Sequence, residues 1–303
     1  MRNGILLHSG ARAVALASLL IFLTAAATTR AVAQAPSATP AATPAATPEE
    51  TLSVTETPDR RLPALTFPKP DQKAQDVLTR AVEAMGGPAY AAVTTVVSRG
   101  NFTPYADGIA TVPIQFTDYL VFPDHERTEF KGSALRSVET YAGERGWLYD
   151  GMKLTIRDAT PEQMRNFRIV MRTSIDNILR GWWVMQRAAL TYVGRREAGL
   201  GRRNEVVRLT YPDGFSVEFE FGARDGLPSK VIYRKPNAEG EEVEEEDRYA
   251  QFLNIGGVVA PFVIDHFRAG TQTSRVNYQT VEFNRPVPDA LFARPADGKT
   301  FKY

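Results

Sequence analysis

The sequence predicts an α+β fold that is predominantly antiparallel β-sheet, a meander of strands closed or nearly closed into a barrel. Two observations carry this prediction. An amphipathic helical segment that begins near residue 71 is followed by many short β-branched and aromatic segments, with turns about every 8–12 residues. The strand pattern is interrupted once, by a helical segment between Asp158 and Arg187.

The first 65 residues lie outside the predicted fold. Residues 1–33 are typical of a signal peptide: Arg2 and Arg12 precede an apolar run at 13–27, and Ala31 and Ala33 offer the small side chains that signal peptidase needs. Residues 34–65 form an Ala/Thr/Pro-rich segment that predicts a disordered linker, because repeated prolines block helix and sheet alike. The folded domain is therefore expected at 66–303. We expect a periplasmic protein without a lipid anchor, and an uncleaved membrane anchor is the alternative.

Composition excludes several classes of function. The chain has 36 basic and 35 acidic residues, and a near-neutral protein lacks the basic face that nucleic acid requires. It has no cysteine, which excludes disulfides, thiol nucleophiles and thiolate metal sites. Stability must therefore come from a buried core.

The helix and strands follow in order. Asp71 to Met85 places apolar residues on one stripe, with Pro70 as a start signal and 86–88 (Gly-Gly-Pro) as a stop signal. The expected strands are Val93 to Phe102, Ile114 to Val121, Glu126 to Lys131, Ser137 to Tyr141, two short strands within Gly146 to Ile156 joined by a hairpin turn at Asp150 and Gly151, Ala189 to Gly194, Glu205 to Tyr211, Phe215 to Phe221, Ser229 to Lys235, Asp247 to Phe252, Val258 to Arg268 and Thr273 to Phe283.

One of these strands indicates which face is covered. Between 215 and 221 every odd residue is apolar and every even residue is polar, so one side of the strand faces water and the other a core or a cavity. In the last strand the apolar phase changes between Tyr278 and Val281. That change predicts a β-bulge near Gln279, a device that bends a sheet into a barrel.

The helical interruption begins with a capping box. Thr160 is the expected N-cap, Pro161 the first helical residue and Gln163 the residue that closes the box. A second short helix is expected after Ser174, followed by a Trp-Trp pair at 182–183. Helices rich in Met, Phe and Trp suit either a movable lid over an apolar cavity or a fixed plug in a barrel core. The sequence favours neither.

The search for chemical motifs finds little. His125 and His266 lie in no metal-ligand or catalytic pattern, and the nucleophile-elbow, phosphate-loop and dinucleotide motifs are absent. The acidic run 239–247 lacks the spacing of a calcium loop and is interpreted as a solvated hairpin that guards an edge strand. We therefore predict no catalytic residue, no cofactor and no metal, although a hydrolase with a dispersed site stays open as a third hypothesis.

The order of structural motifs resembles the outer-membrane lipoprotein-sorting (LolA/LolB-like) carrier superfamily over about residues 71–295. The segments that carry the resemblance are 85–87 (Met-Gly-Gly), 98–100 (Ser-Arg-Gly), 119–127, 146–151, 225–231, 249–261 and 281–292. The resemblance implies an incomplete, half-open β-barrel with an N-terminal helix and short lid or plug helices over an apolar concavity that takes acyl chains. The proline-rich leader and the long insertion imply a divergent member.

Two functions follow from these expectations. The first is a non-catalytic periplasmic carrier that binds lipid or lipoprotein acyl chains, with an inner- or outer-membrane protein as a candidate partner. The second is a structural or accessory envelope protein whose filled core needs no ligand and which docks a partner. The residues expected to bind lipid are Phe116, Met164, Phe167, Ile178, Trp182, Trp183, Phe215, Val217, Phe219 and Phe221.

Overall fold

The computed structural model describes residues 68–133, 135–237 and 239–303. The predicted signal peptide and the whole predicted linker lie outside these residues, so the expected boundaries at 33 and 65 stay predictions. No helix in the described part of the chain has the length and apolarity needed to span a membrane.

The N-terminal helix agrees with the sequence prediction to within one residue at each end. Helix α1 (Gln72–Ala84) begins after Asp71, whose side chain accepts hydrogen bonds from the backbone N–H groups of Lys73 and Ala74. Its buried stripe consists of Ala74, Val77 and Ala81. A short second helix, α2 (Pro88–Ala91), was not predicted, because proline after two glycines was interpreted only as a stop signal. Proline is equally well suited to the first position of a helix.

The sheet is a long antiparallel meander. Its strands are β1 (Thr95–Ala106), β2 (Ile109–Ala110), β3 (Ile114–Val121), β4 (His125–Lys131), β5 (Arg136–Ala142), β6 (Arg145–Asp150), β7 (Thr155–Asp158), β8 (Ala189–Glu197), β9 (Arg203–Thr210), β10 (Ser216–Gly222), β11 (Pro228–Pro236), β12 (Glu242–Ile255), β13 (Val258–Arg268) and β14 (Thr271–Phe283). They pair in the order β7-β6-β5-β4-β3-β1-β14-β13-β12-β11-β10-β9-β8, with β2 added to β1.

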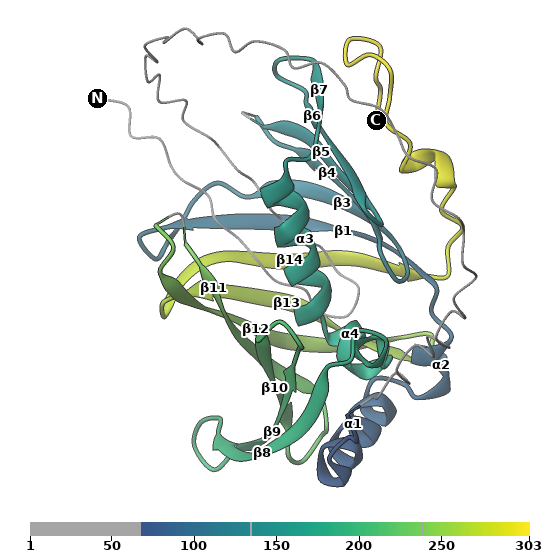
Figure 1. The fold of residues 1–303 in the computed structure, drawn as a ribbon. Helices are drawn as coiled ribbons and strands as arrows, with labels where there is room; N and C mark the ends of the chain where they lie inside the picture. Colours follow the sequence, from purple (N-terminus) through teal and green to yellow (C-terminus); the bar gives the residue numbers. More distant parts are fainter. Residues whose placement is uncertain (1–67, 134, 238) are drawn as a thin grey trace, which may run out of the picture. The chain divides into compact units, whose positions relative to one another are not determined.

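The first and last strands meet in the middle of this order, and strands from the middle of the sequence form its edges. Strand β1 pairs antiparallel with β14, for example Val96 with Phe283. The edges β7 and β8 do not pair with each other among the described residues. The sheet is therefore strongly curved but open (Figure 1), which confirms the half-open barrel.

The predicted bulge is confirmed at the central pair of strands. Arg99 lies opposite Thr280, whereas the next residue, Gly100, lies opposite Tyr278. Gln279 is the extra residue between them. A bulge increases the local bend of the sheet, as a barrel-like curvature requires.

The helical insertion (residues 159–188) connects the two edges. It contains α3 (Pro161–Thr173), α4 (Ile175–Leu179) and the 3₁₀ turn η1 (Trp182–Val184). The predicted capping box is present, because Thr160 accepts from the backbone of Gln163 and the Gln163 side chain accepts from the backbone of Thr160. In Figure 1, α3 runs across the concave face of the sheet toward α4.

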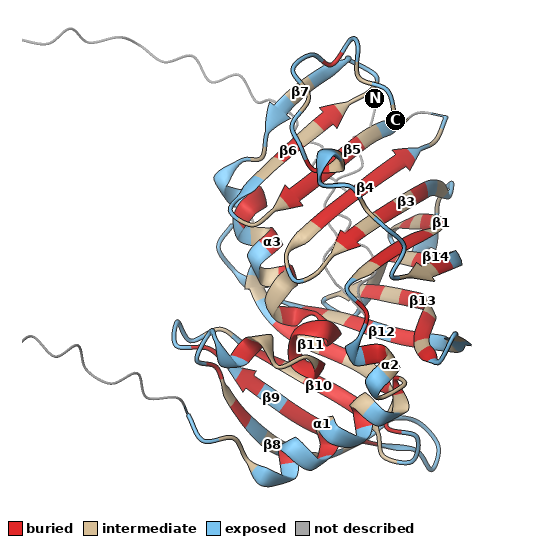
Figure 2. Cartoon of the chain, turned by 90° about the vertical axis from the view of Figure 1, so that its right-hand side faces the viewer, coloured by how far each residue is buried: buried red, intermediate tan, exposed pale blue. Residues whose placement is uncertain are grey.

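Most large apolar side chains on the concave face belong to one buried cluster that also includes α1 and α4. Figure 2 shows the resulting alternation of buried and exposed positions along the strands. The largest fully buried side chains in this cluster are Tyr90, Phe102, Phe130, Phe219, Phe221, Met85, Ile175, Ile178, Leu190, Leu209 and Ile264. Burial of so many large side chains is the main term that stabilises the fold.

The convex face of β4–β6 is covered by the C-terminal segment. The indole N–H of Trp147 donates to the carbonyl oxygen of Phe292 at 2.9 Å, and Arg127 Nη1 donates to that of Leu291 at 2.8 Å. Phe301 packs edge-on against Trp147, with ring centroids 5.7 Å apart. This half of the sheet is therefore protected on its outer side by the chain's own tail.

Candidate functional site on the concave face

Seven of the ten predicted lipid-binding residues belong to the main buried cluster. Val217 and Phe219 are 1% and 0% exposed, which places the odd-numbered row of β10 on the side covered by α1 and α4. The residues that share this cluster are Phe116, Ile178, Trp183, Phe215, Val217, Phe219 and Phe221. Phe215 lies at its margin and is only partly buried.

The other three predicted residues lie elsewhere. Phe167 of α3 stacks on Tyr141 of β5 with ring centroids 4.6 Å apart, and Met164 belongs to the same separate cluster. Trp182 packs against Phe122, at 5.4 Å between ring centroids. The structure therefore divides the predicted residues between the main cluster, a smaller cluster next to β5 and the contact of Trp182 with Phe122.

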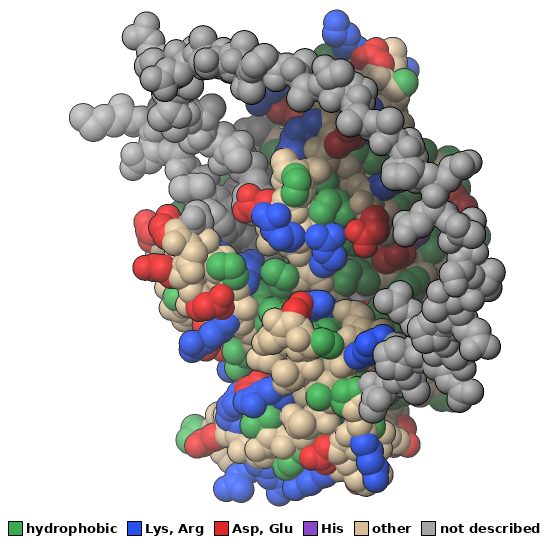
Figure 3. Space-filling view, viewed as in Figure 1, with side chains coloured by type: hydrophobic (Ala, Val, Ile, Leu, Met, Phe, Trp, Pro, Cys, Tyr) green, Lys and Arg blue, Asp and Glu red, His purple; other side chains and the backbone are tan. Residues whose placement is uncertain are grey.

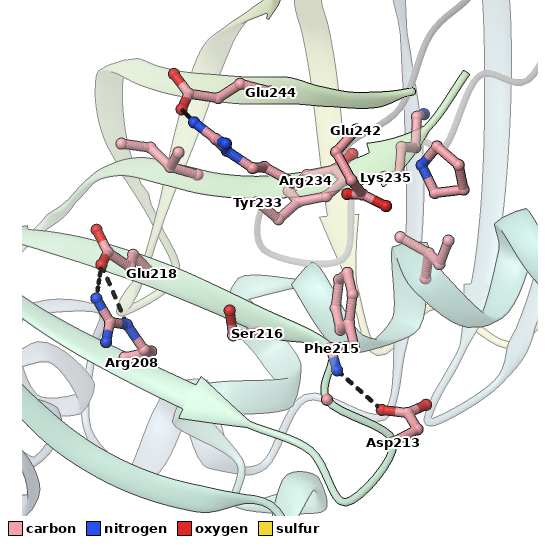
Figure 4. A pocket seen from close by; sticks show the side chains of 14 residues that line it. Arg208, Asp213, Phe215, Ser216, Glu218, Tyr233, Arg234, Lys235, Glu242 and Glu244 are labelled. Carbon is pink, nitrogen blue, oxygen red and sulfur yellow. Dashed lines mark hydrogen bonds and ion pairs between the residues drawn. The ribbon is translucent and has the colours of Figure 1, made fainter. Parts of the chain in front are cut away.

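A pocket of about 600 Å³ opens where β10 and β11 separate (Figure 4). Their pairing ends at Val217 and Tyr233, whereas β11 continues to Pro236. Phe215 and Tyr233 line the pocket, with 6.3 Å between ring centroids, and Ile169 of α3 adds an apolar wall. In Figure 3, basic, acidic and hydrophobic side chains are interspersed over the face that carries α3.

A row of polar side chains crosses the concave face next to the apolar row, and it was not predicted from the sequence. Asp247, His266 and Ser274 lie directly opposite one another on β12, β13 and β14. Asp247 in turn faces Val231, which faces Phe219, so all five share one face of the sheet. We call Asp247, His266 and Ser274 the polar row. Its three side chains are between 0% and 3% exposed.

The acidic run that contributes Asp247 lies inside the sheet, so its interpretation as the guard of an edge strand was wrong. Strand β12 pairs with β11 on one side and β13 on the other. Glu244 and Glu246 form ion pairs with Arg234 and Lys230 on β11, and Asp247 lies on the opposite face from them. The apolar–polar alternation typical of a strand is absent from the acidic run 239–247, because carboxylates lie on both of its faces.

Within the polar row only one contact is made. His266 Nδ1 lies 2.8 Å from Asp247 Oδ1. Ser274 Oγ makes no hydrogen bond, so the contact between nucleophile and base that defines a serine hydrolase is not formed. Asp247 Oδ2 and the hydroxyl of Tyr233 are likewise buried without a hydrogen-bond partner. Since buried polar atoms are nearly always paired, three such atoms together mark a place for water or a ligand.

The comparison with known structures concerns the sheet as a whole. A LolA superfamily protein from Nitrosomonas europaea matches with a TM-score of 0.51 at 16% sequence identity, over 73% of this chain and 97% of that protein. The fold of this chain is similar to that of this LolA superfamily protein. A DUF1329 family protein from Desulfovibrio piger matches with a TM-score of 0.54 at 14% identity, over 74% and 98% of the two chains. No sequence profile of a known family matches this chain, and no curated protein matches its sequence.

Charge is distributed unevenly around the polar row of this LolA-type sheet. Glu245 lies between two cations, with Lys235 Nζ at 3.2 Å and Arg268 Nε at 2.8 Å. Asp247 has no such cation, and burial, partly offset by the bond to His266, raises its pKa to about 6. Burial, with a contribution from Asp247 and Glu245, also holds the pKa of Tyr233 well above its usual value. Among the basic residues of the neighbouring strands, Asp247 contacts only His266, and the charge of Lys235 acts on it without a contact.

The other half of the concave face carries a second polar line. Thr128 donates to Asp118 at 2.7 Å, and Glu139 follows in register on β5. Burial raises the pKa of Glu139 to about 8, although Arg157 opposes the shift. Glu139 is therefore largely protonated at neutral pH, and it does not act there as a fixed negative charge.

An ion pair at the end of α4 attaches this helix to α2 and to the segment that precedes β1. Arg180 Nε donates to Asp176 Oδ1 at 2.8 Å, and the Tyr90 hydroxyl donates to the same oxygen at 2.8 Å. Arg180 also donates to the backbone carbonyls of Tyr90 and Val93 at 3.1 and 3.0 Å. No group of three or more His, Asp or Glu side chains suited to a metal ion occurs in the described ranges.

Proposed function

We propose that this protein is a non-catalytic carrier in the periplasm that binds lipid or acylated cargo on the concave face of its half-open barrel, beneath α3 and α4. The observation that carries the proposal is the open sheet itself. Its edges β7 and β8 are joined by the helical insertion and not by hydrogen bonds, while its concave face is built from large apolar side chains. A sheet of this kind can part from its covering helices without breaking the strand ladder.

The central strands provide an apolar surface that suits an acyl chain. We call Phe102, Phe116 and Phe130 the bed. Phe116 of β3 lies opposite Phe130 of β4, and Phe102 of β1 contacts Phe130 edge-on with ring centroids 6.4 Å apart. Each methylene of an acyl chain that leaves water for such a surface contributes about 0.8 kcal/mol. A chain of about sixteen carbons therefore has enough apolar area to displace side chains of the insertion from this bed.

The second candidate is an envelope protein with a permanently filled core, which would dock a membrane-protein partner. Complete burial of Val217 and Phe219 against the helices favours it, because no cavity is needed to explain their positions. The two proposals differ in whether the insertion moves when an acyl compound is added.

The first experiment asks whether lipid is present. The mature chain, purified without detergent, is extracted and analysed by mass spectrometry, and co-purifying acyl species are expected. Because the chain has no cysteine, a single Ile169→Cys variant can be labelled with an environment-sensitive dye. Addition of a palmitoyl compound should change its emission, whereas a label on the fully exposed position of Leu200→Cys should not respond. Clean extracts together with an unresponsive label in the Ile169→Cys variant would favour the filled core.

A matched pair of variants locates the bed. Phe116→Glu places a carboxylate on the concave face, where burial of an unpaired charge is costly, so acyl binding should collapse. Thr117→Glu makes the same change on the opposite face of β3 and should bind normally. If Phe116→Glu stays folded and binds as well as the wild type, the acyl chain lies elsewhere.

A further inference from the structure

We propose that the polar row, together with Tyr233, is a head-group site that accepts an uncharged, hydroxyl-bearing head such as the glycerol of a monoacylglycerol and rejects an anionic head. This inference rests on the proposed carrier function and names the class of cargo. It follows from where the site lies, which of its atoms are unpartnered and how its charges are balanced.

The site lies where an acyl chain on the concave face would end. Phe219, Val231, Asp247, His266 and Ser274 follow one another in register across five strands. The row has apolar surface on both sides: Val231 lies next to Asp247, and Ser274 lies opposite Pro104, two residues from Phe102 of the bed. An amphiphile whose chain lies on the bed can therefore place its head on the row.

The unpartnered atoms define the chemistry of the head. Asp247 Oδ2 is an acceptor and needs a donor, whereas the hydroxyls of Tyr233 and Ser274 can donate or accept. A vicinal diol supplies donors and acceptors at once. A plain ester supplies acceptors only, and it would leave Asp247 Oδ2 without a partner at the usual cost of a buried unsatisfied group.

The charge balance excludes an anion. Both nearby cations, Lys235 and Arg268, already contact Glu245 at 3.2 and 2.8 Å. Asp247 contacts neither of these two cations, and its only polar contact is with the imidazole of His266. A carboxylate or phosphate placed here would face a like charge in a buried site, where Coulomb repulsion is weakly screened.

The pocket in Figure 4 opens beside one member of the site, Tyr233. Tyr233 and Lys235 line the pocket between β10 and β11, and on β11 they share the face of the polar row. A polar head can therefore enter beside Phe215 and reach Tyr233 without crossing the apolar bed.

The test compares four amphiphiles of equal chain length with the delipidated mature protein at pH 8: 1-palmitoylglycerol, methyl palmitate, palmitate and hexadecylamine. Binding is measured by calorimetry. We expect 1-palmitoylglycerol to bind most tightly and palmitate most weakly. Asp247→Asn should cut the preference for 1-palmitoylglycerol over palmitate about tenfold, which corresponds to one hydrogen bond to a charged group.

Two further variants keep the test decisive. Asp265→Asn makes the same substitution on the opposite face of β13, where Asp265 pairs with Arg275, and should leave the preference unchanged. If Asp247→Asn fails to fold, Tyr233→Phe removes one unpartnered hydroxyl and should weaken 1-palmitoylglycerol more than methyl palmitate.

Different results would overturn the head-group site and the carrier function. Equal binding of palmitate and 1-palmitoylglycerol, or an unchanged preference in the Asp247→Asn and Tyr233→Phe variants, overturns the head-group site and leaves the carrier intact. Tightest binding of hexadecylamine overturns the assignment to an uncharged head. If none of the four amphiphiles binds, the carrier function itself fails, and the unpartnered atoms are satisfied by water.

Discussion

Replacing Arg180 with alanine should loosen α4 from α2 and from the segment that precedes β1. The change removes the cation that contacts Asp176 and two hydrogen bonds to the carbonyls of Tyr90 and Val93. The side chains of Arg180 and Asp176 are only 10% and 2% exposed. A buried carboxylate that loses its partner typically costs about 3–5 kcal/mol. Since domains have a total stability of only about 5–15 kcal/mol, the loss should be large and easily measured.

The measurement is urea unfolding followed by far-UV circular dichroism, with Arg168→Ala as the matched control. Arg168 pairs with Glu144 on the surface, where the two side chains are 51% and 84% exposed, and such pairs contribute less than about 1 kcal/mol. Adding Asp176→Asn to Arg180→Ala should restore part of the loss, because it removes the uncompensated charge. Equal destabilisation by Arg180→Ala and Arg168→Ala would refute the reasoning.

Three further predictions concern stability and processing. Thr160→Ala removes the cap of α3 and should lower the unfolding free energy by about 1 kcal/mol, and an unchanged urea midpoint would count against this role of the capping box. The pKa of Glu139 is raised to about 8 from an ordinary 4.5, so its contribution is fully present below pH 4.5 and is lost as pH rises to 8. Glu139→Gln should therefore gain a few kcal/mol over the wild type between about pH 5 and about pH 8.5, and parallel stability curves would contradict it. Intact mass should show cleavage after Ala33 or Ala35, and a retained Met1 would disprove it.

Much of the fold could be predicted from local patterns. The strand expected from Ile114 to Val121 has those bounds in the structure, and the bulge at Gln279 was visible as a change of apolar phase. These features depend on side chains close in sequence, where periodicity and turn chemistry act directly. Helix α2 was missed because Pro88 serves as a helix start after a stop signal.

The polar row could not be predicted, because its members come from three strands and their register is a property of the assembled sheet. Asp247, His266 and Ser274 meet only if each strand pairs as it does, and a slip of one residue would turn a side chain to the other face. In the sequence, His266 and Ser274 belong to no motif. The buried Asp176 and Arg180 were also missed, since only the apolar side of α4 gives a periodic signal.

The length of the helical insertion limits how far it can move away from the sheet. It is a strap of fixed residue number, 159–188, attached to the sheet at both edges. A helix rises about 1.5 Å per residue, whereas extended chain covers about 3.3 Å or more, so the helical parts of the strap lengthen only by unwinding. The width of a ligand bound between the insertion and the sheet is thereby linked to the helix content of the insertion. A bulky ligand beneath the insertion should therefore lower the helical circular dichroism signal. A slender ligand should leave that signal unchanged.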